Sequence, residues 1–135
     1  MTDFTYLLDT NILSNLIRDP AGSIARRIAE KGEETVCTSI VVACELRFGA
    51  EKKQSASLQA RVEELLTVLD VLALDVDTDV HYAEIRAQLE VAGTPIGPND
   101  LLIAAHARSL DLTLVTANIR EFSRVPGLSV ENWLE

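Results

Sequence analysis

Short apolar runs alternate along this chain with longer amphipathic stretches, a pattern that predicts buried strands separated by helices. The predicted strands are FTYLLD (4–9), TVCTS (35–39), VLAL (71–74), LTLVT (112–116) and, at an edge, LSV (128–130). The predicted helices cover 10–19, 21–32, 40–53, 55–69, 79–93 and 97–107, with a turn at 121–125. Such alternation is typical of an α/β fold, so we expect a central parallel sheet of four to five strands flanked by helices.

One predicted helix, GPNDLLIAAHA (97–107), carries an aspartate at the start of an otherwise apolar sequence. The run from Leu101 to Ala107 has almost no polar stripe, so most of this helix should be buried. Asn99 or Asp100 can cap the helix by accepting backbone N–H bonds. Because Asn99 can serve as the cap alone, Asp100 is free for another role.

Composition sets limits on the function. A chain of 135 residues is expected to be a single domain over 1–135, with 47% hydrophobic and 24% charged residues, as in soluble proteins. No run is long and apolar enough for a membrane span, and the first 20 residues do not resemble a signal peptide, so we expect a cytoplasmic protein. The formal net charge of −9 argues against a nonspecific phosphate-binding surface, and 4% aromatic residues argue against a base-stacking platform.

Four acidic residues follow or face the predicted strand ends, where open parallel sheets bind ligands. Asp9 closes the first strand, Glu45 lies on the helix after the second, and Glu121 follows the fourth, while Asp100 can point into the same space. Each alone has an ordinary alternative as a helix cap, ion-pair partner or surface acid. Together, in a partly apolar pocket, they repel one another unless a cation is present. Oxygen ligands with little His or Cys favour Mg²⁺ or Mn²⁺ over zinc and suit metal-assisted phosphodiester hydrolysis.

Three segments resemble the PIN-domain ribonucleases, specifically the VapC-type toxins of bacterial toxin–antitoxin pairs. They are YLLDTNILSNLI, TSIVVACELRFGA and GTPIGPNDLLIAAHARSLDLTLVTANIREFSRVPGLSVENW. The resemblance covers nearly the whole chain, with the motifs in the family's order. It implies a three-layer PIN-like fold in which Asp9, Glu45 and Asp100 are the metal-binding catalytic acids.

The resemblance leaves the fourth acid open. Many relatives carry Asp at the position of Asn118, and Glu121 is the nearest remaining carboxylate, used in this way by some VapC-like proteins. Thr10 and Ser39 match small hydroxyl residues that the family places beside the metal, where they would orient its ligands, as would Asn118.

The resemblance also implies an activity and partners. We expect a Mg²⁺- or Mn²⁺-dependent endoribonuclease that cuts an exposed loop of structured RNA, such as tRNA, leaving 5′-phosphate and 3′-OH ends. The expected partners are a VapB-type antitoxin and a second copy of the chain, with DNA contacted only through the antitoxin and no membrane. Candidate RNA-binding residues, for which solvated surface charge is an equally good reading, are Arg18, Arg47, Lys52, Lys53, Arg120 and Arg124.

Other residues have structural interpretations. His106 is expected to be a core histidine rather than a catalytic base, and Trp133 a packing anchor. The apolar stripe from Leu58 to Leu69 is first of all core, and part of its surface is a candidate antitoxin groove.

Three alternative functions require other residue patterns or another assay to distinguish them. A haloacid-dehalogenase-type phosphatase needs a second Asp two positions after the first, where this chain has Asn11, and a late lysine, whereas the last lysine here is Lys53. A receiver domain needs an acidic pair near the first strand and also a late lysine; Asp3 is poorly placed for that pair. A PIN-like module that binds RNA without cutting it remains open, and a nuclease assay with a metal titration distinguishes it.

Overall fold

Five short parallel strands form the centre of the computed structural model, which describes residues 3–134. Their order across the sheet is β3-β2-β1-β4-β5, so the first strand lies in the middle. The strands are β1 (Tyr6–Leu8), β2 (Val36–Ser39), β3 (Val71–Leu72), β4 (Thr113–Val115) and β5 (Val130–Glu131). β1 pairs on one side with β2, Leu7 opposite Cys37, and on the other with β4, Leu7 opposite Leu114. The predicted α/β class and parallel sheet are confirmed.

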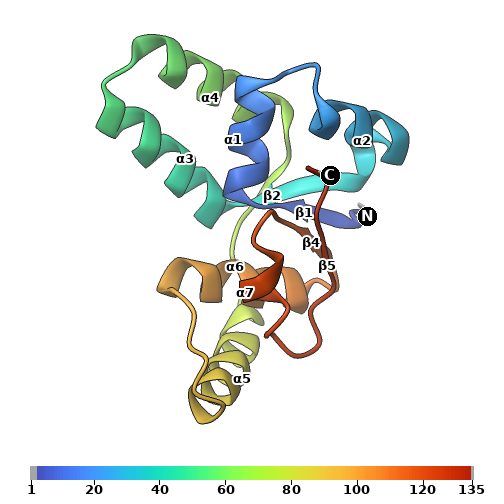
Figure 1. Cartoon of the computed structure of the whole chain (residues 1–135), viewed down its shortest axis with the longest axis vertical. Helices are drawn as coiled ribbons and strands as arrows, with labels where there is room; N and C mark the ends of the chain where they lie inside the picture. Colours follow the sequence, from blue (N-terminus) through green and yellow to red (C-terminus); the bar gives the residue numbers. More distant parts are fainter. Residues whose placement is uncertain (1–2, 135) are drawn as a thin grey trace.

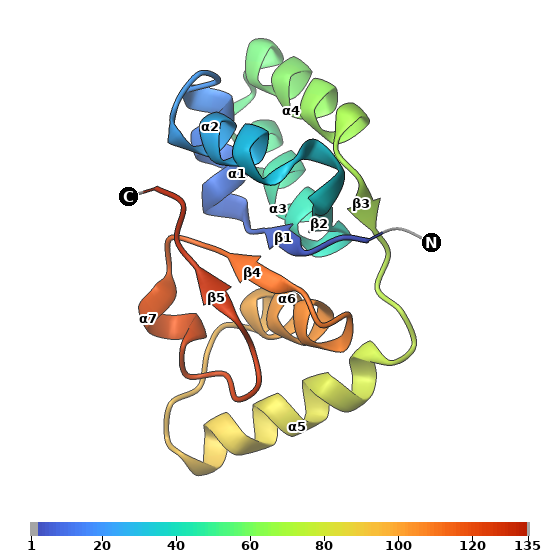
Figure 2. The same ribbon diagram turned by 90° about the vertical axis from the view of Figure 1, so that its right-hand side faces the viewer.

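Helices cover both faces of this sheet, as Figures 1 and 2 show. They are α1 (Thr10–Arg18), α2 (Ser23–Lys31), α3 (Ile40–Lys53), α4 (Ala56–Val68), α5 (Thr78–Val91), α6 (Pro98–Ser109) and α7 (Ile119–Phe122), with a 3-10 turn η1 (Glu33–Thr35). Helices α1 to α4 lie on one side of the sheet, and α5 and α6 on the other (Figure 2). Within residues 3–134, no helix is long and apolar enough to cross a membrane.

The core lies on both faces of the short central strands. Leu7 and Leu8 are fully buried, as is Leu114 on β4, because helices cover both sides of the sheet. Trp133 is also fully buried, and its ring meets that of Tyr6 edge-to-face with centroids 4.9 Å apart. The interpretation of Trp133 as a packing anchor is therefore confirmed.

Two local predictions were wrong. Helix α6 begins at Pro98 and its N-cap is Gly97, with no side-chain hydrogen bond, so Asn99 is not the cap. Proline favours the first helical position because its fixed φ suits the helix and its missing N–H is not needed there. The turn predicted at 121–125 was wrong only in its first two residues, which are the second half of α7; turn residues follow from 123.

Candidate metal and active site

Asp9 occupies the junction between β1 and α1. Its carboxylate accepts a bond from the backbone N–H of Thr10 at 2.8 Å, which caps α1, and another from the hydroxyl of Thr116 at 2.7 Å. Asp9 is only 3% exposed. Burial raises the pKa of Asp9, the bonds from Thr116 and Thr10 oppose that rise, and the charges of Glu45 and Glu121 add to it. Asp9 is thus both a cap and a buried acid facing other acids.

Glu45 projects toward Asp9 from the second turn of α3. One carboxylate oxygen accepts a hydrogen bond from the hydroxyl of Thr10, and the other accepts one from the side-chain amide of Asn99 at 3.3 Å. These donors belong to α1 and α6, so Glu45 is held between two helices that are distant in sequence. Hydrogen bonds to both oxygens fix the plane of the carboxylate.

Asp100 lies in the first turn of α6, close to the other acids. Burial, a hydrogen bond with Glu121, and the charges of Glu121, Asp9 and Glu45 together raise the pKa of Asp100 to about 7. Glu121, in α7, accepts a hydrogen bond from the side-chain amide of Asn118. The four predicted acids therefore lie near enough to influence one another's ionisation, which is the arrangement the sequence suggested.

An open cavity of about 460 Å³ lies between these side chains. Its lining residues are Asp9, Thr10, Asn11, Ser14, Arg18, Glu45, Asp100 and Asn118. Glu121 does not line this cavity, but it contacts two residues that do, Asn118 and Asp100. The lining offers carboxylate, hydroxyl and amide oxygens and no thiol or imidazole, a set that fits Mg²⁺ or Mn²⁺.

The acids are gathered but not closed around one point. Among residues 3–134, no three carboxylate, imidazole or thiol side chains are already drawn together tightly enough to hold a metal ion. Their mutual repulsion explains this spacing, because like charges favour separation until a cation offsets them. The pKa values of Asp9 and Asp100 are raised first by burial and then by the charges of the neighbouring acids, and a bound divalent cation would offset both effects.

Two sequence-based assignments differ from the structure. Ser39 does not line the cavity: it is fully buried, caps α3 by accepting a bond from the N–H of Val41, and contacts His106. The small hydroxyl beside the acids is Thr10 alone of the predicted pair. Arg47 points to α4, where it forms an exposed ion pair with Glu63, which matches the surface ion pair considered as its alternative role.

The remaining basic candidates differ in their distance from the acids. Arg18, at the end of α1, lines the acid cavity itself and has no carboxylate within 4.0 Å among residues 3–134. Lys53 lines a neighbouring cavity that also contains Glu45. Lys52, Arg120 and Arg124 are exposed on α3 and around α7. Arg18 is thus the basic residue best placed beside a phosphate at the acids.

Sequence reasoning missed three polar residues that orient the acids. Asn11 donates weakly to Asp9, at 3.4 Å, and its carbonyl oxygen accepts a bond from the N–H of Ala117 at 2.9 Å. Thr116 donates to Asp9, and Asn99 donates to Glu45. All three lie next to recognised motif residues, so the neighbours of strand-end acids were the available signal.

We expect Glu121→Gln to reduce RNA cleavage more than Asn118→Ala. Glu121 supplies a charge that reaches Asp9 and Asp100, whereas Asn118 supplies only the hydrogen bond that orients Glu121. Removing a residue that orients a metal ligand lowers activity about 10–100-fold, and removing the charge of Glu121 should lower it further. Cleavage rates of the two purified variants at saturating Mn²⁺ provide the measurement. The reverse order would move the fourth ligand to Asn118.

The comparisons with known proteins agree with this geometry. A family model described as PIN domain matches residues 6–128. The chain is 41% identical over 129 residues to the tRNA(fMet)-specific endonuclease VapC of Shigella flexneri, covering 95% of this chain and 97% of the relative. It is similar to the chain in the crystal structure of VapBC2 from Rickettsia felis bound to a promoter DNA fragment, with a TM-score of 0.89, 36% identity and coverage of 96% and 99%.

A second solved structure, DNA-bound VapBC from Salmonella typhimurium, matches with a TM-score of 0.87 and 38% identity, covering 96% of this chain and 98% of that one. Likeness of this extent in both sequence and fold goes beyond a shared architecture. The chain therefore belongs to the PIN domain family, among the VapC ribonuclease toxins of toxin–antitoxin systems.

Proposed function

We propose that this protein is a single-domain, divalent-metal-dependent endoribonuclease toxin that cuts structured RNA, with tRNA as the leading substrate class. The observation that carries the proposal is the gathering of Asp9, Glu45, Asp100 and Glu121 at one edge of the sheet, with the pKa values of Asp9 and Asp100 raised. Carboxylates held this way are unfavourable without a cation. The substrate class is supported by the relative named tRNA(fMet)-specific endonuclease.

Each side chain has a defined task in this proposal. Asp9, Glu45 and Asp100 would hold Mg²⁺ or Mn²⁺, and Glu121 would complete the set directly or through water. When bound, such a cation activates water and stabilises charge on the phosphoryl oxygens. Thr10 and Asn99 fix the carboxylate of Glu45 for this purpose.

The proton that Asp100 carries in part of the metal-free protein must leave when a cation binds. Near neutral pH the pKa of about 7 leaves Asp100 partly protonated in the metal-free protein. Arg18, on the rim of the same cavity, can pair with a non-bridging phosphate oxygen of the bound RNA. Because water is the nucleophile, the 2′-OH is not required, and we expect 5′-phosphate and 3′-OH ends.

Cleavage of total RNA by antitoxin-free protein tests the proposal. We expect cleavage with Mg²⁺ or Mn²⁺ and none in EDTA, because EDTA removes the divalent cation that balances the charge of the acids. Product ends are read by labelling with and without phosphatase. Undiminished cleavage in EDTA, or 2′,3′-cyclic phosphate ends, would contradict the metal mechanism. RNA binding without cutting would support the non-catalytic alternative.

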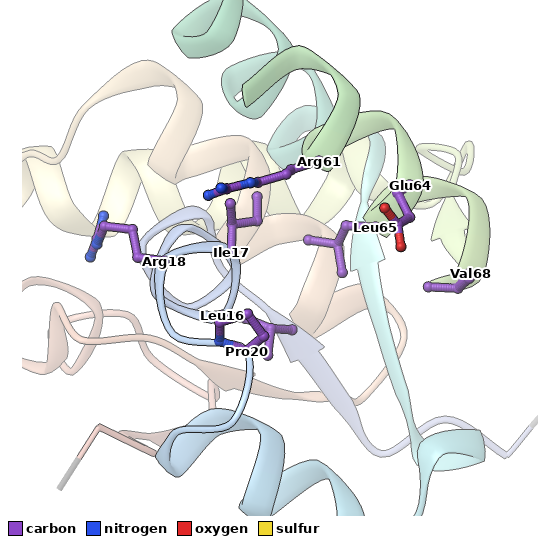
Figure 3. Close-up of a pocket in the computed structure, with 8 residues that line it drawn as sticks. All are labelled: Leu16, Ile17, Arg18, Pro20, Arg61, Glu64, Leu65 and Val68. Carbon is purple, nitrogen blue, oxygen red and sulfur yellow. The ribbon is translucent and has the colours of Figure 1, made fainter. Parts of the chain in front are cut away.

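An apolar groove between α1 and α4 is the surface proposed for the antitoxin (Figure 3). It has a volume of about 470 Å³ and is lined by Leu16, Ile17, Arg18, Pro20, Arg61, Glu64, Leu65 and Val68. A second cavity, which shares Leu16, Leu65 and Val68, extends it toward α2. A groove of this kind suits the apolar face of a partner helix. The predicted stripe on α4 therefore contributes to both core and groove.

The groove leads to the acids. Arg18 and Ile17 line both the groove and a neighbouring cavity, and that cavity shares Thr10, Ser14, Arg18 and Glu45 with the acid site. A partner helix in the groove can thus extend a tail to the acids, where an arginine would pair with the carboxylates. The solved VapBC complexes support a partner of this type, which would also provide the DNA contact. A homodimer is part of the same proposal.

Val68→Asp is expected to weaken antitoxin binding at least about tenfold while leaving RNA cleavage intact, because a charge must then be buried in the groove. Val68 is 78% exposed in the free chain, so the fold should tolerate the change. Val91→Asp is the matched control, since Val91 is 90% exposed and also ends its helix, α5. Titration calorimetry with the antitoxin measures the effect. Equal affinities for the two variants would place the antitoxin elsewhere.

A further inference from the structure

Helices α3 and α6 are joined by a polar contact deep in the core. The hydroxyl of Ser39 lies 2.8 Å from Nδ1 of His106, and both residues are fully buried. The residues are 67 positions apart in the sequence. Buried polar pairs constrain geometry more than apolar contacts do, because a hydrogen bond is directional and hydrophobic contact is not.

The direction of the bond follows from the neighbouring atoms. Ser39 Oγ already accepts a hydrogen bond from the N–H of Val41, so its own proton is available for Nδ1. Burial lowers the pKa of His106, against the opposing effects of Ala73 and Asp75, and so favours the neutral ring. A neutral ring whose Nδ1 accepts the proton of Ser39 carries its own proton on Nε2, which has no hydrogen-bond partner within residues 3–134. The chain of donors runs from Val41 through Ser39 to His106.

This contact is one of two that clamp α3 against α6. The other is the bond from Asn99 to Glu45. Glu45 is six positions after Ser39, and His106 is seven positions after Asn99. These spacings correspond to about 9 Å and about 10.5 Å along the axes of the two helices. The helices therefore run antiparallel past each other, one clamp in the core and the other at the acids.

Small side chains make up half of the buried residues of α6. Beside Leu101, Ile103 and His106 these are Ala104, Ala105 and Ala107, which form only shallow ridges. The clamp at the acid site is a single bond of 3.3 Å near solvent.

We propose that Ser39 and His106 are positioning residues: their buried hydrogen bond fixes the register of α6 on α3 and so holds Asp100 opposite Glu45. This inference rests on the proposed metal-dependent function. It also gives Ser39 a role that differs from the one expected from the sequence, since Ser39 acts through His106 and not beside the cation.

Metal affinity measured by Mn²⁺ titration calorimetry, without RNA, tests the pair. We expect Ser39→Ala and His106→Leu each to weaken Mn²⁺ binding about tenfold. This is the low end of the loss of affinity, about 10–100-fold, caused by removing a residue that orients a metal ligand. Single-turnover cleavage should slow while KM for RNA stays near wild type. His106→Asn keeps an acceptor near the position of Nδ1, and Ser39→Thr keeps the hydroxyl, so both should restore much of the affinity.

Ser55→Ala is the matched control for the lost helix cap. Ser55 caps α4 through the N–H of Leu58, as Ser39 caps α3, but makes no contact with α6. Wild-type Mn²⁺ affinity in Ser39→Ala and His106→Leu would overturn the inference, as would Ser39→Thr being as impaired as Ser39→Ala. Wild-type protein that binds no Mn²⁺ would overturn the proposed function as well, so the two failures are distinguishable.

Discussion

Asp9→Asn is expected to lower RNA cleavage by at least about a hundredfold and to abolish growth arrest when expressed without antitoxin. Removing a residue that only orients a metal ligand lowers metal affinity or activity about 10–100-fold. Asp9 is itself a proposed ligand, so its loss should have a larger effect. Asparagine keeps the oxygen that caps α1, so the bond from the N–H of Thr10 survives. The loss should therefore come from the missing charge and not from misfolding.

The measurement compares single-turnover cleavage of total RNA by wild type and variant at equal, circular-dichroism-matched protein levels. Asp79→Asn is the control, because Asp79 is an exposed acid in the first turn of α5, away from the cavity. We expect the control to cleave as wild type does. An Asp9→Asn variant that retains cleavage and arrest would contradict the assignment of the acids.

The fold and the four acids were predictable because each rests on a local signal. Short apolar runs ending in Asp9 or Ser39 mark strand ends, and parallel strands bring their ends to one edge of the sheet. The cap of α6 was misplaced by two residues: Asn99 was predicted, but Pro98 at the first helical position makes Gly97 the N-cap. That shift frees the amide of Asn99 for Glu45.

The partners of the polar side chains were not predictable, because they are set by tertiary contacts between distant segments. Ser39 looks the same in sequence whether it faces a metal or, as it does, a histidine 67 residues away. The ion pair between Arg47 and Glu63 joins α3 to α4, and the two residues are 16 positions apart in the sequence. Glu121 reaches the site because it lies on α7. There its carboxylate accepts a hydrogen bond from Asn118, three residues earlier in the sequence.

Asp100→Asn is expected to melt above wild type in EDTA at pH 8. The pKa of Asp100 rises from an ordinary 3.8 to about 7 in the folded protein. A group with a raised folded pKa gives its full stability below the unfolded pKa, and that stability is lost as pH rises through the folded pKa. Metal-free wild type should therefore lose stability between about pH 4 and pH 8, whereas the variant lacks this dependence.

After allowance for solvent screening at this partly exposed site, the gap at pH 8 should be on the order of 1–2 kcal/mol, or about 3–6 °C in Tm. Asparagine loses only the few tenths of a kcal/mol by which an acid in the first turn stabilises a helix. Added Mg²⁺ should raise the Tm of wild type and barely move Asp100→Asn, because a ligand that binds only the folded state stabilises it by mass action. Differential scanning calorimetry in EDTA at pH 5 and 8 measures both effects, with Asp79→Asn as control. If the variant melts below wild type at both pH values, Asp100 is an acid that stabilises the first turn of its helix. It is then not a residue that destabilises the fold in order to bind a cation.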